Sequence, residues 1–355
     1  MGTSRGYDAL IGTGGLGSGI YFALEGDETV GREESRGGHL LDRRDYGKLH
    51  IVCHYVRVLL GDEFLVVPVG RLGADDAGDI VRRELCHLGL DLSHVGTDEA
   101  RPTLFSVCFA YPRGEGGNFT ALNSASAVVT SEDVRATQPM FERFRDRGIA
   151  LAAPEVPILA RATLLSLATE YGFLRVGSFV TAELRDGLAD PLLELLDVLA
   201  INIDEAAALA ACAPGESAEA VTAAAVEFVR DKHSQLSIVV TAGRYGSWVW
   251  DGLRLSRDRG IETQVVNAAG AGDAHLGAVI VALASGLSIR DANHFATIVS
   301  TLKVGSQDTI NRAIDVAAVE EAAGRFKRAI PVPLLERLTA PARRSATKRT
   351  NAVFG

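Results

Sequence analysis

The second half of the chain alternates short apolar runs with helical patterns, and this alternation constrains the fold more than any other feature. Apolar runs of strand length occupy 149–152, 174–176, 198–202 and 236–241, with helical stretches between them. Strands that alternate with helices along a chain form a mostly parallel sheet covered by helices on both faces. The sequence therefore predicts a large α/β domain with a doubly wound sheet.

The two ends of the chain depart from this alternation. Two β-like runs flank a turn rich in proline and glycine at 112–116, which predicts a hairpin. We expect segments at about 18–36 and 101–122 to form a small β lid on a domain that spans 1–330. The remaining stretch, 331–355, is basic and lacks periodicity, so we expect a flexible tail there.

Composition excludes several classes of protein. The 355 residues carry a formal net charge of −9 without a dominant basic stripe, which argues against a nucleic-acid partner. No apolar run has the length and pattern of a membrane span, and the N-terminus has no apolar signal core. The four cysteines lack metal-ligand or redox spacing. We expect a cytoplasmic protein that binds neither nucleic acid nor membrane.

A glycine-rich turn at Asn267–His275 follows a β-like run, 263–266, and precedes an apolar helical run. The first amides of a helix lack internal partners, and the helix dipole favours negative charge there, so the turn predicts an anion hole. Asp273 stands in the first turn of this helix. A carboxylate beside an anion hole suits the removal of a proton from a hydroxyl that attacks a phosphoryl group. The amides at this helix start include those of Gly270, Ala271 and Gly272.

A second glycine-rich turn, 12–17, matches the G-x-G-x-x-G fingerprint of dinucleotide-binding proteins directly after a strand-like run. That fingerprint requires a helix after the glycines, whereas 18–24 is β-branched and aromatic. The sequence therefore favours a tight chain crossing or close backbone approach to a ligand over a nicotinamide or flavin enzyme. We expect Gly15 to lie beside the substrate.

Two further motifs stand where predicted strands end. Asn202 ends the run at 198–202, and Glu205 follows it. A glycine turn, 241–246, begins where the run at 236–241 ends. Ligands of α/β sheets bind at the carboxyl ends of the strands. Each motif is also explained by ordinary structure, the first as a helix start and the second as a hairpin start.

In this order, the motifs resemble the ribokinase-like (PfkB) family of sugar and nucleoside kinases, over about residues 8–328. Asn267–His275 is similar to the D-T-T-G-A-G-D-A-F of such families. Gly26–Val30 resembles their G-E-T, Arg36–Gly38 their P-G-G, and Val69–Gly78 their V-G-x-V-G-x-D-x-x-G.

The resemblance implies a doubly wound domain with a β lid that uses ATP to phosphorylate the hydroxyl of a small-molecule substrate. Asp273 would be the general base, and Asn202 and Glu205 would place Mg²⁺ through water. Many relatives dimerise through the lid, so we also expect a homodimer. The resemblance further implies contacts with the nucleotide, from Thr241, Gly243 and Gly246 beside the phosphates and ribose and from Thr297, Val304 and Gly305 beside the adenine.

The chain departs from the family on the substrate side. Gly17 replaces an Asp that binds sugar hydroxyls. A charged insertion at 39–48 follows the P-G-G equivalent, whose last residue, Gly38, would lie beside the substrate. The insertion is either a solvated loop or a rebuilt site for an anionic or phosphorylated substrate. In the second case Arg suits the anion through its bidentate fork. The residues of that rebuilt site would be Asp42 and Asp45, which bind hydroxyls, and Arg43, Arg44 and Lys48, which grip the anion.

Two departures lie in the C-terminal motif itself. Asn267 replaces its first Asp, and His275 replaces its Phe. Many relatives hold a monovalent cation near this loop, and the missing carboxylate weakens the case for that cation without deciding it. His275 either faces the substrate or is a packed, hydrogen-bonded histidine.

The expected function is therefore an ATP-dependent carbohydrate kinase, with a nucleoside kinase as the alternative within the same chemistry. A non-catalytic nucleotide or sugar sensor on a kinase fold is a second class, suggested by the substitutions at Gly17 and Asn267. The presence of Asp273, Asn202 and Glu205 argues against a sensor, because binding alone does not need a base.

Overall fold

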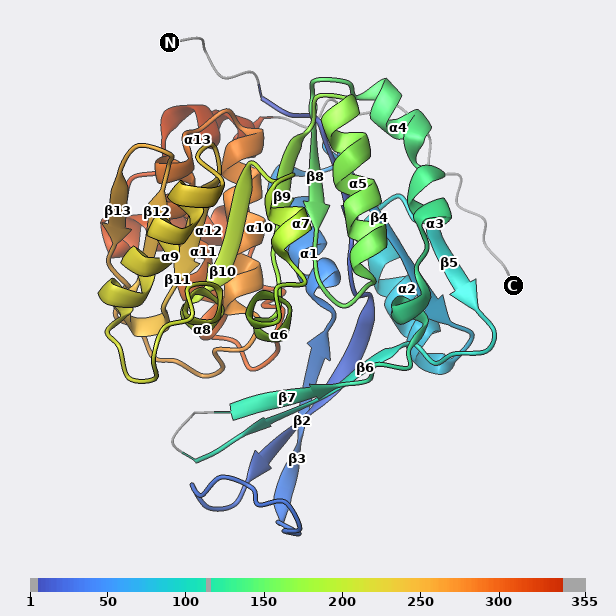
Figure 1. Ribbon diagram of the computed structural model, residues 1–355, viewed down its shortest axis with the longest axis vertical. Helices are drawn as coiled ribbons and strands as arrows, with labels where there is room; N and C mark the ends of the chain where they lie inside the picture. The colour runs from blue at the N-terminus through green and yellow to red at the C-terminus, as the bar shows by residue number, and fades with distance from the viewer. Residues whose placement is uncertain (1–5, 113–115, 341–355) are drawn as a thin grey trace.

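The computed structural model describes residues 6–112 and 116–340, which form a three-layer α/β domain with a small sheet projecting from one edge (Figure 1). Neighbouring strands of the large sheet pair in parallel except at one edge. There the strand at 247–250 pairs antiparallel with both of its neighbours, 237–241 and 255–258. The predicted doubly wound α/β fold is confirmed. In spatial order the large sheet consists of β13 (Leu255–Asp258), β12 (Ser247–Trp250), β11 (Ser237–Thr241), β10 (Val198–Asn202), β9 (Leu174–Gly177), β8 (Gly148–Ala152), β1 (Ala9–Thr13), β4 (Leu65–Gly73) and β5 (Val95–Asp98).

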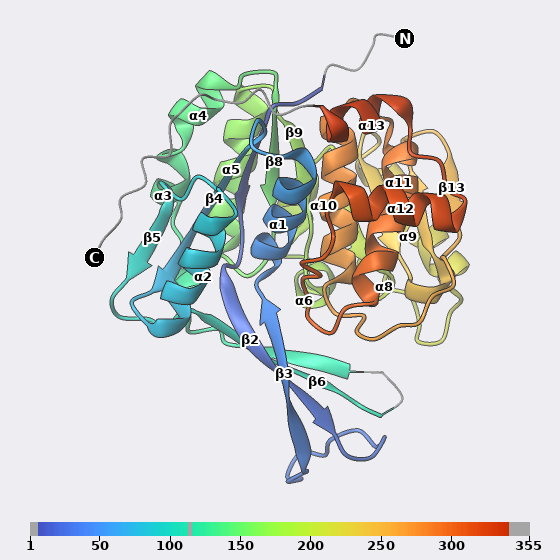
Figure 2. The ribbon, with the colours of Figure 1, turned by 180° about the vertical axis from the view of Figure 1, so that it is seen from behind.

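Helices cover both faces of this sheet (Figures 1 and 2). Successive side chains of a strand point to opposite faces, so Leu10 packs into one core and Ile11 into the other. One face carries α1 (Lys48–Leu60), α2 (Asp76–His87), α10 (Ala271–Ala284), α11 (Ile289–Val304), α12 (Val316–Phe326) and α13 (Val332–Thr339). The other carries α3 (Ser131–Arg135), α4 (Gln138–Arg143), α5 (Ile158–Glu170), α6 (Thr181–Arg185), α7 (Asp190–Leu193), α8 (Ile203–Leu209) and α9 (Ala218–Lys232).

The small sheet is the lid, and its strands in spatial order are β3 (Gly38–Tyr46), β2 (Gly17–Leu24), β6 (Leu104–Ala110) and β7 (Gly116–Thr120). The hairpin predicted around 112–116 is present as β6 and β7. The interpretation of 39–48 as a loop is wrong, because most of this segment belongs to β3, which pairs with β2 on both sides of an irregularity between Ile20 and Tyr21. Apolar side chains remain exposed on the lid, among them Leu40 and Phe119.

The N-terminal glycine turn leads from β1 directly into β2, so the helix that a dinucleotide fingerprint requires is absent there. The turn is instead a tight chain crossing, as the sequence suggested. A Cβ on Gly17 would lie 2.2 Å from the carbonyl oxygen of Leu104, so only glycine fits where β2 meets β6.

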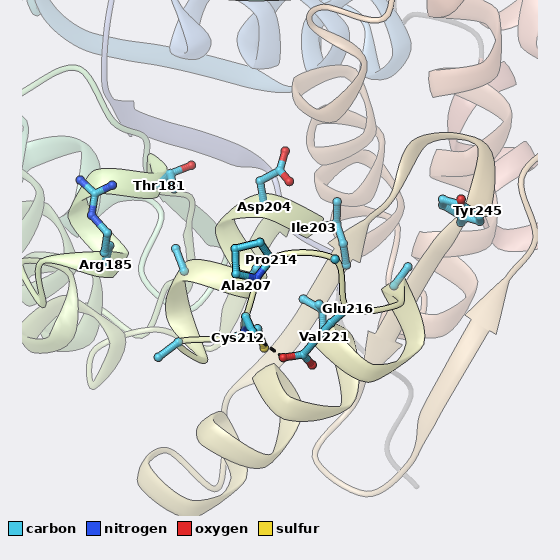
Figure 3. Close-up of a pocket in the computed structure, with 15 residues that line it drawn as sticks. Thr181, Arg185, Ile203, Asp204, Ala207, Cys212, Pro214, Glu216, Val221 and Tyr245 are labelled. Carbon is cyan, nitrogen blue, oxygen red and sulfur yellow. Dashed lines mark hydrogen bonds between the residues drawn. The ribbon is translucent and has the colours of Figure 1, made fainter. Parts of the chain in front are cut away.

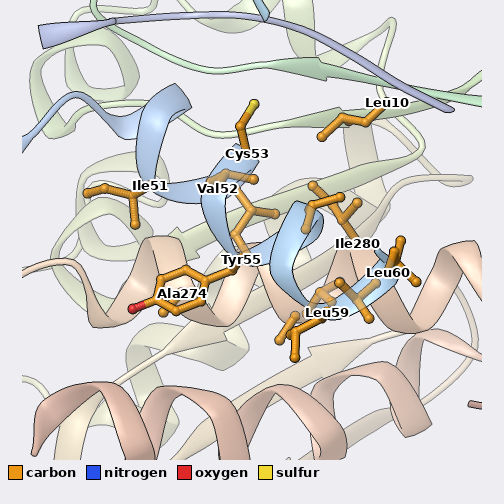
Figure 4. Packing of buried hydrophobic residues seen from close by; sticks show 14 of the residues in the cluster. Leu10, Ile51, Val52, Cys53, Tyr55, Leu59, Leu60, Ala274 and Ile280 are labelled. Atoms are coloured by element: carbon orange, nitrogen blue, oxygen red, sulfur yellow. The ribbon is translucent and has the colours of Figure 1, made fainter. Parts of the chain in front are cut away.

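Helices α1 and α10 pack closely against each other, and this contact sets the geometry of the site described below (Figure 4). A Cβ on Gly277 would lie 3.0 Å from the Cβ of Tyr55, so the glycine brings the two helices near. The hydroxyl of Tyr55 accepts a hydrogen bond from the amide of Asn311 at 2.8 Å. The first turns of α1 and α10 consequently lie at the same edge of the sheet.

Two predictions of local structure are wrong. The β-like run at 263–266 is not a strand, because the amides of Val266 and Asn267 donate to the carbonyl of Val304 at the end of α11. The predicted flexible tail contains α13, whose Leu334 and Leu338 lie one turn apart and are buried. Residues 341–355, with the basic cluster, lie outside the described residues. Over 6–112 and 116–340, no helix is both long and apolar enough to cross a bilayer.

Candidate active site

The turn before α10 has the geometry of an anion hole. Gly270 has φ of 76°, and a Cβ there would lie 2.5 Å from the carbonyl oxygen of Thr309, so the position requires glycine twice over. The amide of Ala271 donates to the carbonyl of Ala268 at 3.1 Å. Within the described chain no side chain caps this helix, which leaves the next amide, that of Gly272, open to a ligand. Of the three amides expected in the hole, that of Ala271 is therefore engaged within the turn, and those of Gly270 and Gly272 remain candidates.

Asp273 lies in the first turn of α10 and is partly buried. Burial raises the pKa of its carboxyl above the usual range, and the nearby carboxylate of Asp45 raises it further. The positive charges of Lys48 and Lys303 act in the opposite direction and lower this pKa. A carboxylate held in this way retains affinity for a proton, as a general base requires.

Lys48 links Asp273 to two further carboxylates. Its amide donates to Oε2 of Glu155 at 3.0 Å, and its Nζ lies 3.7 Å from Oε1 of Glu205. Burial opposes the charge of the Lys48 ammonium, but Asp273, Glu205 and Glu155 outweigh burial and raise its pKa. The side chains come from α1, α8, α10 and the loop after β8, so four separate segments converge on one charged cluster.

Asn202 and Glu205 cap α8, and one of them also reaches this cluster. Oδ1 of Asn202 accepts from the amide of Glu205 at 2.9 Å, and Oε2 of Glu205 accepts from the amide of Asn202 at 2.8 Å. This is a capping box, so the helix-start explanation is correct for Asn202. Oε1 of Glu205 remains directed at Lys48. Burial raises the pKa of Glu205, which Lys48 partly offsets.

The residues assigned to the nucleotide fall into two places. Thr241 ends β11 beside Asn202 of β10, and its Oγ1 lies 4.0 Å from where a Cβ on Gly272 would stand, so it borders the anion hole. Gly243 and Gly246 follow it with φ of 51° and 92°. Thr297 is buried within α11 and donates to the carbonyl of Asn293 at 3.1 Å.

Val304 and Gly305 lie at the end of α11, against the segment that leads to the anion hole. The Val304 carbonyl accepts the amides of Val266 and Asn267 at 2.8 and 3.2 Å. Gly305 is the residue that caps this helix. These two residues, unlike Thr297, therefore border the loop that carries Asp273.

Asp45 approaches the cluster from the lid strand β3. Its side chain is buried, and Oδ2 accepts a hydrogen bond from the hydroxyl of Ser106 on β6. Burial, Cys108 and Asp45 raise the pKa of Tyr21, whose hydroxyl faces the side chain of Asn267. Asp45, Ser106 and Tyr21 thus form a polar patch from three lid strands, and Asp45 lies within electrostatic reach of Asp273.

Two other predicted substrate residues, Arg44 and Gly38, do not reach the cluster. The guanidinium of Arg44 pairs with Glu84 of α2 at 3.0 Å, because neighbouring residues of a strand point to opposite faces. Gly38 pairs with Leu24 at the end of β2 and β3 that lies farthest from Asp45. The side chains of Asp42 and Arg43 lie outside the described residues.

The prediction that His275 faces the substrate is wrong. Its Nε2 hydrogen-bonds to Oδ1 of Asn293 at 3.0 Å, and its Nδ1 lies 3.4 Å from the hydroxyl of Ser300, so the ring packs between α10 and α11. Burial lowers the pKa of this histidine to about 4, which keeps the ring neutral. The packed, hydrogen-bonded alternative is correct.

Comparison with known proteins places this arrangement in a family. The model of the pfkB family of carbohydrate kinases matches residues 56–316, which is well over half of the chain. The chain belongs to this family.

Several solved structures share the fold of this chain. Ribokinase from Cryptococcus neoformans var. grubii serotype A in complex with ADP has a TM-score of 0.73 at 20% identity, covering 90% of this chain and 99% of that one. Ribokinase from Giardia lamblia has a TM-score of 0.75 at 16% identity, with 88% and 99% covered. The nucleoside kinase of Burkholderia thailandensis in complex with inosine has a TM-score of 0.68 at 17% identity, with 90% and 98% covered.

One acidic residue of this PfkB-family protein was missed by sequence reasoning. Glu155 follows β8 with φ of 76°, a conformation that non-glycine residues rarely adopt and that concentrates at functional sites. Burial raises its pKa to about 7. Gly15 lies against it, since a Cβ there would stand 2.1 Å from Oε2 of Glu155. The rule that identified Asn202, a polar residue at the carboxyl end of a strand, would also have identified Glu155.

A hollow between α6, α8 and α9 is separate from this site (Figure 3). Asp204, Cys212 and Glu216 line it, together with Tyr245, but none of the clustered side chains does. Asp204 of α8 lines this hollow, whereas the next residue, Glu205, is directed at Lys48. The hollow and the Asp273 cluster therefore share no lining side chain among the described residues.

Proposed function

We propose that the protein transfers the γ-phosphoryl group of ATP to a hydroxyl of a sugar or sugar derivative, with Asp273 as the general base. The observation that carries the proposal is the position of Asp273, which lies one residue beyond the open amide of Gly272, within electrostatic reach of Lys48 and Asp45. A base, an anion hole and a lid-borne polar patch are the parts that phosphoryl transfer to an alcohol requires.

In the proposed reaction, the acceptor hydroxyl lies between the Asp45 patch and Asp273. Its oxygen attacks the γ-phosphorus, the bond to the bridging oxygen of ADP breaks, and the hydroxyl proton passes to the Asp273 carboxylate. The amide of Gly272 stabilises charge that grows on the transferring group. Lys48 keeps Asp273 ionised before the reaction, because its ammonium lowers the pKa that burial raises.

The proposed reaction also includes Mg²⁺, which would neutralise phosphate charge. The donor set suits it, because Mg²⁺ in nucleotide sites takes one or two carboxylates and completes its shell with water and phosphate oxygens. Glu205 would hold the ion through water with Oε1, since Oε2 is committed to the amide of Asn202. Asn202 would act only by orienting Glu205, since its Oδ1 is committed to the capping box.

The charges around the proposed acceptor position favour a neutral substrate. Asp45 would repel an anion, and Arg44, which was expected to attract one, is paired with Glu84. Lys48 is shared among three carboxylates. The similarity to a nucleoside kinase that binds inosine makes a nucleoside the second candidate, since its ribose presents the same hydroxyls.

The experiment that tests the function measures ADP release from ATP and Mg²⁺ with neutral sugars, sugar acids, sugar phosphates and nucleosides. We expect turnover with a neutral sugar or a nucleoside and loss of turnover in Asp273→Asn. Asp62→Asn is the matched control, because Asp62 is an exposed carboxylate beyond the far end of α1. ATP binding without turnover on any acceptor would instead support the sensor alternative.

The proposed assembly is a homodimer through the lid. The exposed apolar side chains of Leu40 and Phe119 support it, because contact with a second lid would remove them from water. Light scattering of the purified protein tests it, with twice the monomer mass expected.

A further inference from the structure

Lys303 places a buried positive charge behind the anion hole. It occupies the last turn of α11 and is fully buried. Its Nζ donates to the carbonyl oxygen of Asn267 at 2.8 Å. A cation at this end of a helix is favoured by the helix dipole. The ammonium therefore contacts the first residue of the turn that carries Asp273.

Asn267 is bonded through every polar group it has. Besides its carbonyl, its amide donates to Val304 at 3.2 Å and its Nδ2 donates to the carbonyl of Gln307 at 2.7 Å. Its Oδ1 accepts from the amide of Ala269 at 3.0 Å. Asn267 consequently ties the turn to the loop that follows α11, with Lys303 at the centre of the junction.

This junction does not fit the monovalent cation that the family resemblance implies for many relatives. Such an ion needs several oxygen ligands, but the side-chain oxygen of Asn267 is committed to Ala269, and its carbonyl is committed to an ammonium. Two positive charges on one carbonyl oxygen would repel each other strongly in a buried site. A carboxylate that could offset that repulsion is absent at position 267.

We propose that the Lys303 ammonium takes the place of the monovalent cation, holds the turn 267–270 in position, and makes phosphoryl transfer independent of K⁺. Lys303 is a positioning residue in this account, because it acts on the turn and on Asp273 without touching the reacting atoms. The prediction that turnover is independent of K⁺ rests on the proposed kinase function. The prediction that stability and ATP binding do not respond to K⁺ follows from the contact between Lys303 and Asn267 alone.

The first test uses the unmodified protein and needs no acceptor. The melting temperature and the ATP dissociation constant are measured while K⁺ is exchanged for tetramethylammonium, which is too large to enter the junction. We expect neither value to change. A rise in melting temperature together with tighter ATP binding specific to K⁺ would overturn the proposal, even for a protein that shows no kinase activity.

The second test uses variants and turnover. Lys303→Met should lower kcat by roughly tenfold or more, the scale of lost outer-shell support, while the ATP dissociation constant changes little. K⁺ or NH₄⁺ should restore part of the loss. Lys303→Arg should retain most of the turnover, and Lys232→Met, which removes a lysine on the opposite face, should retain all of it. Full turnover in Lys303→Met without any cation response would contradict the proposal.

A third readout separates positioning from mere stability. Besides Lys303, the groups that act on Asp273 are Lys48, Asp45, Glu155, Glu205 and Tyr55, and none of these changes in the variants. Loss of the ammonium should therefore move the acid limb of the pH–rate profile to higher pH in Lys303→Met but not in Lys303→Arg. If Lys303→Met does not fold, the K⁺ exchange on the unmodified protein and the pH–rate profile of Lys303→Arg still test the proposal. An acid limb that moves in Lys303→Arg would contradict the positioning role of Lys303.

Discussion

The Nζ of Lys48 lies 3.7 Å from Oε1 of Glu205, although Lys48 begins a helix on one face of the sheet and Glu205 lies in a helix on the other. The two helix starts meet over the carboxyl ends of the strands, where the sheet is no longer between them. Charges from both layers can therefore act on Asp273. This convergence explains how residues far apart in the sequence form one site.

The pH dependence of turnover should respond in opposite directions to the two charges that face Asp273. The base works when ionised, so turnover falls as the pH falls through its raised pKa. Lys48→Met removes a positive neighbour and should move the acid limb to higher pH, whereas Asp45→Asn removes a negative one and should move it lower, each on the order of one pH unit. The pH of half-maximal kcat/KM measures both shifts. A shift of the same sign in both variants would contradict the assignment of Asp273.

Glu155 should destabilise the fold at neutral and higher pH. Its pKa of about 7 in the folded state exceeds the ordinary glutamate pKa of 4.5, so the folded state binds the proton more tightly. The stability that this proton contributes is lost as the pH rises from 4.5 through about 7. Glu155→Gln should therefore raise the free energy of unfolding at pH 8, on the order of 1–3 kcal/mol, and much less at pH 5. Urea unfolding at the two pH values measures the difference. An equal rise in the free energy of unfolding at pH 5 and pH 8 would contradict a raised pKa of Glu155.

Gly270→Ala should disturb the turn directly. The new Cβ would lie 2.5 Å from the carbonyl oxygen of Thr309 at a φ of 76°, a strain of about 1–3 kcal/mol. We expect a lower melting temperature and reduced turnover, since the turn carries Asp273. Gly324→Ala is the matched control, because a Cβ there meets nothing within 4 Å and a helix interior favours alanine. Equal behaviour of the two variants would mean that the turn tolerates a side chain.

His275→Ala should act on stability and not on substrate affinity. The variant leaves Asn293 without its buried partner, which costs about 1–3 kcal/mol. Thermal unfolding measures the loss, and the KM for the acceptor should stay unchanged. A raised KM with unchanged stability would restore the interpretation of His275 as a substrate residue.

The sequence predicted the fold well because strands that are buried on both faces of a sheet appear as short, continuous apolar runs, such as 149–152 and 174–176, with helices between them. It did not predict β3, because charged side chains obscured a strand whose partner, β2, supplies the pairing. It named Asp273, Glu205 and Lys48, which stand at helix starts. The shared cluster was not foreseeable, because it depends on how separate layers meet.

Other features of the site depend on tertiary contacts that no local pattern encodes. Lys303 belongs to the helix that carries Thr297 and Val304, but the place of its buried ammonium is evident only from the contact with Asn267. Arg44 looked like an anion ligand, and only the position of α2 shows that Glu84 pairs with it. Residue type and spacing therefore identified candidates, while packing decided which of them reach the site.

The most direct test of the account compares Asp273→Asn with Asp62→Asn in ATP binding and in turnover of the best acceptor. The amide keeps the shape of the side chain but cannot accept the proton. Asp273→Asn should bind ATP nearly as tightly as the unmodified protein and turn over roughly 10²–10⁴-fold more slowly, while Asp62→Asn keeps full activity. Unchanged turnover in Asp273→Asn would contradict the role of Asp273 and the mechanism built on it.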